Sequence, residues 1–368
     1  MKKFVRFVVP LLFLVANIAV VGPAALASTS QGHVGEVYTM TNDPSGNEVA
    51  VFDRATDGTL TLAETVATGG KGSGGGTDPL ASQNSLVVSQ NGKWLLAVNA
   101  GSNDISVFRI RAGGLNLTDT VESGGTNPVS VAIASNRVYV LNNGAPANIV
   151  GFVLRGGHLT PIPHSTRSLG AGDFGQVGFD NSASHVIITD KADSELLVYR
   201  LSRWGIPSAD PVTTPSSGTT PFGFTTEKSG RILVVEVNGG NGAVSSYRVK
   251  KDGALQLISG SVVSGQAAAC WIASDGRGLA FTTNPGSPSL SSYGYNRKGA
   301  VTLLDATAAT GAATLDAGIT RNGRFLYALN PGGGGIQMYR VGHDGSLTDL
   351  GLASGGLAGY AQGLAVGK

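Results

Sequence analysis

The sequence has few of the residues that usually carry covalent or charge-based function. Cys270 is its only cysteine, so no disulfide can form within the chain. Charged residues make up 14% of the chain and the net charge is +2, which gives no basis for a nucleic-acid-binding surface. The five histidines fall in turns, connections or outer positions, where we expect solvated side chains. Stability must therefore come from packing rather than from cross-links.

Long apolar runs are also scarce, and the only one lies near the N-terminus. A basic start at Met1–Arg6 precedes an apolar stretch at 7–21, and Ala25-Leu26-Ala27 supplies small residues around a cleavage site. We predict a signal peptide at 1–27 and a single exported domain at 28–368, with a retained membrane anchor as the alternative. The mature protein is expected to be secreted, periplasmic or at the cell surface, with no membrane contact after cleavage.

A repeat occupies the rest of the chain, which contains 55 glycines. "NGKWLLAVN" at 91–99 returns as "NGRFLYALN" at 322–330, and five further units lie in step with these two. Each unit has an apolar strand that usually ends in Asn or Asp, an aromatic residue nine or ten positions later, and a glycine turn. The strand-ending residues are Asn42, Asn99, Asn142, Asp190, Asn238, Asn284 and Asn330, and the aromatic residues are Phe52, Phe108, Phe152, Tyr199, Tyr247, Tyr293 and Tyr339.

This period predicts an all-β, seven-bladed β-propeller with four-stranded antiparallel blades. Units of about 40 to 50 residues with four short strands are typical of propeller blades, and no segment has the periodicity of a helical repeat. The first unit lacks its inner strand, which the C-terminal segment Ala361–Val366 is expected to supply, closing the ring in blade one. The insertion Gly69–Pro79 lengthens the spacing between the first two recurring aromatic residues, Phe52 and Phe108. We expect it to form a flexible surface loop between blades one and two.

The blade motifs "NGRFLYALN", "NGKWLLAVN", "SNRVYVLNN" and "DGSLTDL" resemble those of the seven-bladed lactonase-like propellers. That group includes propeller 6-phosphogluconolactonases and fungal carboxymuconate-lactonising enzymes, and it overlaps the YVTN-type repeats. The resemblance implies lactone hydrolysis by His, Arg and acidic groups around the central channel. The chain departs from this pattern at Gly172–Phe179 and Thr189–Glu195, which keep only Asp190, and at Asn284, which Pro285 follows in place of Arg.

The candidate site is the mouth of the channel, where one residue from each blade converges. This ring is polar and largely uncharged, which suits the hydroxyl groups of a sugar or polyol better than a phosphate. The candidate ligand-binding residues are Asn84, Ser85, Asn127, Ser130, Gln176, Glu236 and Gln362. The candidate catalytic residues are Asp173, Asp190 and Asp316.

Three functions fit these residues. The leading hypothesis is a monomeric binding or scaffold protein whose channel mouth takes a small polar ligand, a glycan or a protein partner. The first alternative is a hydrolase in which one of the three aspartates activates water to open a sugar-acid or related lactone. The second alternative is a surface adhesion module that uses the blade-top loops. No metal or cofactor is expected, because no metal-binding motif is present and the glycines at 70–75 do not open a βαβ helix.

Overall fold

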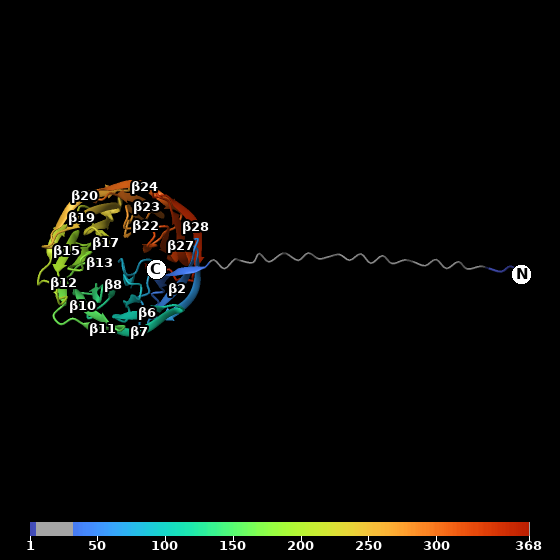
Figure 1. The fold of residues 1–368 in the computed structure, drawn as a ribbon, viewed down its shortest axis with the longest axis horizontal. Coiled ribbons are helices and arrows are strands. Elements are labelled where there is room, and N and C mark those ends of the chain that lie inside the picture. The colour runs from blue at the N-terminus through green and yellow to red at the C-terminus, as the bar shows by residue number, and fades with distance from the viewer. Residues whose placement is uncertain (5–31, 368) are drawn as a thin grey trace. The chain divides into compact units, whose positions relative to one another are not determined.

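The computed structural model describes residues 1–4 and 32–367. The predicted signal peptide falls mostly on residues 5–31, outside the described residues, and the propeller is formed by the unit Gly32–Lys368. Seven antiparallel sheets follow one another around a ring, with the first strands of the blades toward the centre and the last at the rim (Figure 1). The prediction of an all-β, seven-bladed propeller is confirmed. No helix among the described residues has the length and apolarity needed to cross a membrane.

In each of the first four blades, the strands are ordered from the inside outward. Blade one contains β29 (Gln362–Val366), β1 (His33–Met40), β2 (Glu48–Ala55) and β3 (Leu60–Ala67). Blade two contains β4 (Leu86–Val88), β5 (Trp94–Asn99), β6 (Asp104–Arg111) and β7 (Gly114–Glu122). Blade three contains β8 (Pro128–Ala134), β9 (Arg137–Asn142), β10 (Ala147–Arg155), β11 (His158–Pro161) and β12 (Arg167–Gly170). Blade four contains β13 (Phe174–Phe179), β14 (His185–Asp190), β15 (Glu195–Arg200) and β16 (Val212–Pro215).

The remaining three blades each have four strands in the same order. Blade five contains β17 (Pro221–Glu227), β18 (Arg231–Glu236), β19 (Ala243–Val249) and β20 (Leu255–Val263), with the 3-10 turn η1 (Asn238–Gly240). Blade six contains β21 (Trp271–Ser274), β22 (Leu279–Asn284), β23 (Ser289–Tyr295) and β24 (Val301–Thr310). Blade seven contains β25 (Ala317–Ile319), β26 (Phe325–Asn330), β27 (Gly335–Val341) and β28 (Leu347–Ser354), with η2 (Pro331–Gly333).

The burial of each strand follows from its place in the blade. The second and third strands are covered on both faces by neighbouring blades. Their sequences are therefore mostly apolar and nearly all of their residues are buried, as in β14 and β26. The outer strands face solvent, and β16 is mostly exposed. The seven aromatic residues that recur in the sequence all lie in third strands and are 3% exposed or less. They form the cores between blades, which explains why the repeat keeps an aromatic ring at this position.

Blade three is the one blade with a fifth strand among the described residues. Its outer position is shared by two short strands, β11 and β12, which both pair with β10.

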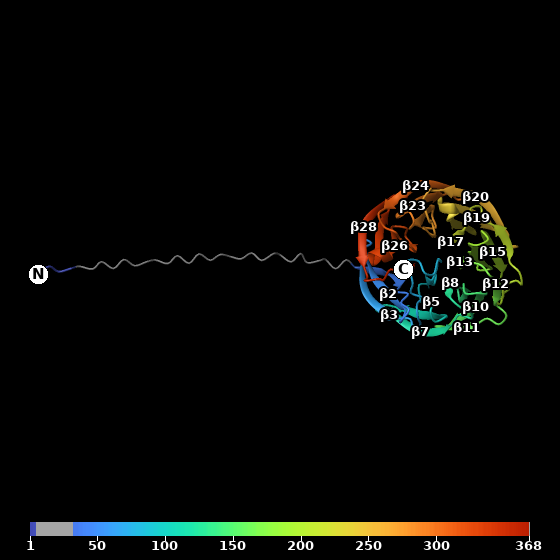
Figure 2. The same cartoon turned by 180° about the vertical axis from the view of Figure 1, so that it is seen from behind.

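The ring closes through blade one, as predicted. β29 pairs antiparallel with β1, and Val366, Ala365 and Leu364 lie opposite Val37, Tyr38 and Thr39. The C-terminal end of the chain thus returns to the centre of the ring beside its first strand (Figure 2). The pairing shifts register between Leu364 and Gln362, and Gly363 at this shift has a backbone φ of 75°. The closing strand leaves blade one no open inner edge.

Candidate functional site at the channel mouth

The end of the predicted surface loop and the residues that follow it enter the channel instead of staying on the surface. We call residues 78–83 the channel plug. The earlier part of the insertion is held against blades one and two, since the Gly72 and Gly74 amides donate to the Asp43 and Asn42 carbonyls at 2.8 and 3.0 Å. A Cβ at Gly72 would lie 2.0 Å from the Asn42 backbone, so only glycine fits there. The insertion therefore serves to carry the plug to the ring axis.

Hydrogen bonds join the plug to blades three and four. The Ser82 hydroxyl donates to the Val129 carbonyl, and the Ser130 hydroxyl donates to the Gln83 carbonyl, both at 2.7 Å. The Gln83 amide donates to the Gly175 carbonyl at 3.0 Å. These bonds fix the plug backbone against two inner strands that follow it by about 50 to 90 residues.

The Gln83 side chain reaches across the channel to blade six. Its Nε2 donates to the Ile272 carbonyl at 3.1 Å and its Oε1 accepts from the Ile272 amide at 3.0 Å. The Trp271 indole donates to the Ser82 carbonyl at 2.8 Å. A Cβ at Gly223 would lie 2.0 Å from Gln83 Oε1, so any larger residue at this position in blade five would displace the Gln83 side chain.

Two of the predicted ligand-binding residues hold the blades and the plug together. The Ser130 hydroxyl, which bonds the plug, also accepts from the Val177 amide at 3.2 Å. The Gln176 side chain donates to the Phe224 carbonyl at 3.0 Å and accepts from the Phe224 amide at 2.7 Å. Both side chains are buried, with at most 2% exposure, and their bonds run between blades.

The structure places three further predicted ligand-binding residues in different surroundings. The Asn127 backbone amide donates to the Asn103 side chain at 2.7 Å. Ser85 is fully buried, and its hydroxyl has no hydrogen-bond partner among the described residues. Asn84 lies with Gln83 and Gln176 along a cavity of about 460 Å³ that reaches past the ends of the inner strands of blades three to five.

Glu236 is placed inside blade five rather than at the mouth. It lies opposite Pro221 as Asn142 lies opposite Pro128, so Glu236, and not Asn238, is the strand-ending residue of its unit. One carboxylate oxygen accepts from the Ser245 hydroxyl at 2.8 Å and the Gly218 amide at 2.9 Å. Glu236 is 0% exposed, so these bonds within the blade account for its polar side chain.

The predicted catalytic residues in blade four are engaged in different ways. Asp173 is the most accessible, with a side chain 59% exposed that pairs with Lys191 Nζ at 2.9 Å. Asp190 is 5% exposed, and it accepts from the Ala192 and Asp193 amides at 3.0 and 3.2 Å. Burial raises the pKa of Asp190, while these amides act in the opposite direction. Asp190 therefore closes the turn after β14.

Asp316 of blade seven points toward the closing strand. It is 3% exposed, and its Oδ2 accepts from the Gly363 amide at 3.0 Å. Burial raises the pKa of the Asp316 carboxyl to about 7. A carboxyl with this pKa exchanges its proton near neutral pH.

Asp78, on the plug, is a residue that the sequence reasoning missed. Burial and the neighbouring charge of Asp316 raise its pKa to about 8. The Gln362 amide lies beside Asp78, yet neither of its polar atoms has a hydrogen-bond partner of normal geometry among the described residues. The plug, blade seven and the closing strand thus contribute the Asp78 carboxyl, the Asp316 carboxyl and the Gln362 amide to one group. A lone Asp inside a glycine-rich insertion carried no signal of this role.

Lys191 supplies the positive charge at the mouth. Its Nζ donates to the Ala81 carbonyl at 2.7 Å and lies 5.0 Å from the centre of the Phe222 ring. Its charge lowers the pKa of Asp78 against the larger effect of burial. Cys270 lies near this group, and burial raises the pKa of its thiol, so the thiolate nucleophile does not form near neutral pH.

The mouth therefore holds a set of groups suited to acid–base chemistry. Burial raises the pKa values of two carboxyls to about 7 and 8, so near neutral pH one can accept a proton while the other donates. An ammonium group held by Ala81 and Asp173 lies close enough to influence Asp78.

Comparison with known proteins finds a family model that matches part of the chain. The ring is a seven-bladed β-propeller. Residues 38–165 match the family model described as "Lactonase, 7-bladed beta-propeller", which confirms the resemblance seen in the sequence. No curated protein matches the chain.

Solved structures share the whole ring. A protein from Lactobacillus plantarum has a TM-score of 0.71 and 17% identity, with 91% of this chain and 100% of that chain covered. A periplasmic gluconolactonase from Pseudomonas aeruginosa has a TM-score of 0.67 and 14% identity, with 90% and 99% covered. A candidate 6-phosphogluconolactonase from Bacteroides uniformis has a TM-score of 0.66 and 19% identity, with 89% and 99% covered. At these identities the likeness shows the fold alone.

Proposed function

We propose that the protein is an exported lactonase that opens an uncharged sugar-acid lactone at the channel mouth. The observation that carries this proposal is the pair of carboxyls, Asp78 and Asp316, brought together by segments far apart in the chain and both titrating near neutral pH. The lactonase-type family match and the gluconolactonase among the similar folds support the same reaction class. The leader predicted at 1–27 and the periplasmic location of that gluconolactonase support export.

The reaction assigned to this pair is hydrolysis of the ring ester. The ionised carboxyl of the pair takes a proton from water, and the resulting hydroxide adds to the lactone carbonyl. Lys191 has two acceptors, Ala81 and Asp173, and its remaining N–H is available for the developing oxyanion. The protonated carboxyl then gives its proton to the ring oxygen as the acyl–oxygen bond breaks, which yields the open hydroxy acid.

The charges at the mouth favour an uncharged substrate over a phosphorylated one. Lys191 is already paired with Asp173, and the Asp173 carboxylate and the ionised member of the Asp78–Asp316 pair would repel a phosphate. The exposed Asp173 carboxylate and the neighbouring Asn143 amide are placed to bond sugar hydroxyls. We therefore expect gluconolactone to be opened faster than its 6-phosphate.

The test is proton release from gluconolactone by the purified mature protein, corrected for spontaneous opening. Asp78→Asn and Asp316→Asn are each expected to lower kcat/KM about 100-fold or more, because each removes one member of the pair. Asp190→Asn is the matched control. Its side chain keeps an acceptor for the Ala192 amide, so activity should stay within about threefold of wild type.

A second candidate function has an observation of its own. The plug occupies the ring axis, and its bonds are made by hydroxyl, amide and backbone groups rather than by His or Arg. This favours a binding protein whose mouth takes a glycan or protein partner. If gluconolactone, its 6-phosphate and aliphatic lactones are all opened no faster by wild type than by Asp316→Asn, the lactonase proposal is wrong, and binding to a glycan array becomes the decisive measurement.

A further inference from the structure

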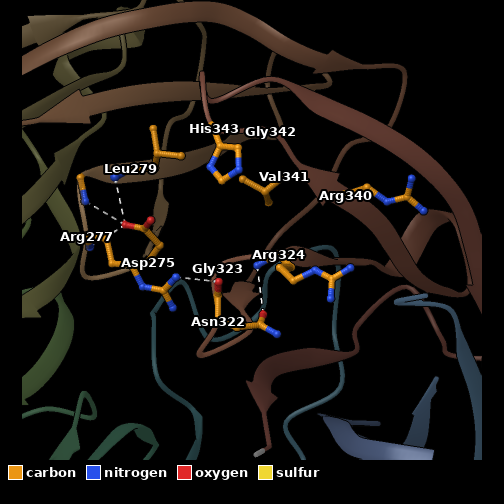
Figure 3. Close-up of a pocket in the computed structure, with 11 residues that line it drawn as sticks. Asp275, Arg277, Leu279, Asn322, Gly323, Arg324, Arg340, Val341, Gly342 and His343 are labelled. Atoms are coloured by element: carbon orange, nitrogen blue, oxygen red, sulfur yellow. Dashed lines mark hydrogen bonds between the residues drawn. The ribbon is translucent and has the colours of Figure 1, made fainter. Parts of the chain in front are cut away.

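A groove between blades six and seven lies apart from the channel mouth. It encloses about 520 Å³ and is lined by the turn between β21 and β22, the turn between β25 and β26, and the end of β27 (Figure 3). Four of its side chains are basic, namely Arg277, Arg324, Arg340 and His343. Asp275 is its one acid.

The single carboxylate is occupied by its own turn. One oxygen of Asp275 accepts from the Arg277 amide at 2.8 Å and from the Gly278 and Leu279 amides at 3.0 Å. These bonds hold the turn between β21 and β22 in place. The other Asp275 oxygen and Arg277 Nη1 both lie near Gly323 of blade seven.

The arginines of the groove form no salt bridge among the described residues, although the charge of Arg340 helps to lower the pKa of the Asp57 carboxyl. No arginine takes part in any ion pair among residues 1–4 and 32–367. Arg277 donates to the carbonyls of Asn322, at 2.8 Å, and Arg321, which ties blade six to blade seven and fixes its guanidinium. Two hydrogen bonds leave three of its five N–H groups unused.

Arg324 and Arg340 come from neighbouring positions of one sheet. Arg340 lies opposite Phe325 in the pairing of β26 with β27, and the Arg324 guanidinium lies 5.4 Å from the centre of the Phe325 ring. Figure 3 shows the two arginine side chains extending toward the same side, with the His343 ring projecting into the groove between its turns. Charge of one sign is therefore concentrated on fixed elements.

Other blades use the equivalent positions differently. In blade two, Arg109 occupies the position equivalent to Arg340. The central carbon of its guanidinium lies 4.7 Å from the centre of the Trp94 ring. In the smaller groove between blades four and five, His185 pairs with Asp180 at 3.3 Å, and the other basic side chains are one arginine, Arg200, and two lysines, Lys250 and Lys251. The position of Arg340 is basic in several blades, for example Arg200 in blade four, and the groove between blades six and seven differs in containing three arginines.

We propose that this groove binds a compact oxyanion, a phosphate or sulfate group carried by a small molecule. Guanidinium groups bind such oxyanions through paired N–H donors, and the volume admits an anion together with a small attached group. The site is independent of the lactonase proposal, because it shares no residue with the channel mouth.

The experiment is titration of the mature protein with inorganic phosphate and, separately, inorganic sulfate. Calorimetry is run at two temperatures and constant ionic strength, so that a vanishing heat at one temperature cannot hide binding. The double variant Arg324→Gln, Arg340→Gln is expected to weaken binding of both anions at least tenfold. Arg248→Gln is the control, since Arg248 follows Tyr247 in blade five as Arg340 follows Tyr339 and lies outside the groove.

The outcomes separate cleanly. Binding by wild type and Arg248→Gln, with loss in the double variant, supports the site, and a preference for one anion identifies the group. Equal weakening in the control and the double variant means non-specific attraction to surface arginines and overturns the proposal. Absence of heat at both temperatures overturns it as well. None of these results depends on lactone turnover.

Discussion

The buried carboxyl of Asp316 should make the protein less stable as the pH rises. Its pKa is about 7 in the folded protein against 3.8 for an ordinary Asp, so the folded state holds the proton more tightly than the unfolded state. Between these two values the folded protein carries more protons, and its free energy of unfolding falls with rising pH. The loss is complete above the folded pKa.

The size of the effect follows from the shift. One pKa unit corresponds to about 1.4 kcal/mol, and because the slope flattens near the folded pKa, the loss from this group between pH 5 and pH 7 is about 2 kcal/mol. Asp316→Asn removes the titration and keeps an acceptor for the Gly363 amide. It also removes the charge that raises the pKa of Asp78, so the stability of the variant should vary less with pH.

Urea unfolding at pH 5, 6, 7 and 8 measures this difference. The quantity compared is the free energy of unfolding of wild type minus that of the variant, in which the titration of the five histidines cancels. Asp305→Asn is the control, because Asp305 is exposed and accepts from the Thr307 amide much as Asp316 accepts from Gly363. Parallel curves for wild type and Asp316→Asn would show that Asp316 is already ionised in the fold, and the acid–base assignment would lose its basis.

Two further predictions concern the closing strand and the plug. Deletion of Ala361–Lys368 removes the strand paired with β1 and the buried Leu364, so it should cost roughly 5 kcal/mol or more in urea unfolding, and equal stability would contradict the closure. Gly223→Ala places a methyl against Gln83 Oε1 and should cost about 1–3 kcal/mol. The cost should shrink in a Gln83→Ala background, and full additivity would show that the two residues do not interact.

The blade count and the closure could be predicted because they depend on local, repeated signals. An aromatic residue that must fill each gap between blades recurs at a fixed interval, and the unpaired edge of blade one required a strand from elsewhere. The register was wrong by two residues in blade five. In blade five, Glu236 occupies the end of the second strand, where most other blades have an Asn. Asn238, two residues later, fitted the expected residue type and was therefore chosen from the sequence.

The candidate site was harder to predict because it depends on a segment that belongs to no blade. Asp316 and Gln362 were placed near the channel from their position in the repeat. Asp78 has no counterpart in other units, and glycine-rich insertions are usually surface loops. What brings it inward is a set of bonds to residues about 50 to 190 positions later, such as those of Gln83 to Ile272, and no local pattern encodes these.

The plug also bears on how the ring unfolds. Repeats that contact only their neighbours can lose order one at a time, as linear arrays do. In this ring one short segment is bonded to blades three, four and six, so disorder in any one of them weakens the anchoring of the other two. The ring should therefore melt as a cooperative whole. During synthesis, the segment that precedes blade two can complete its bonds only once the chain has been extended as far as Ile272.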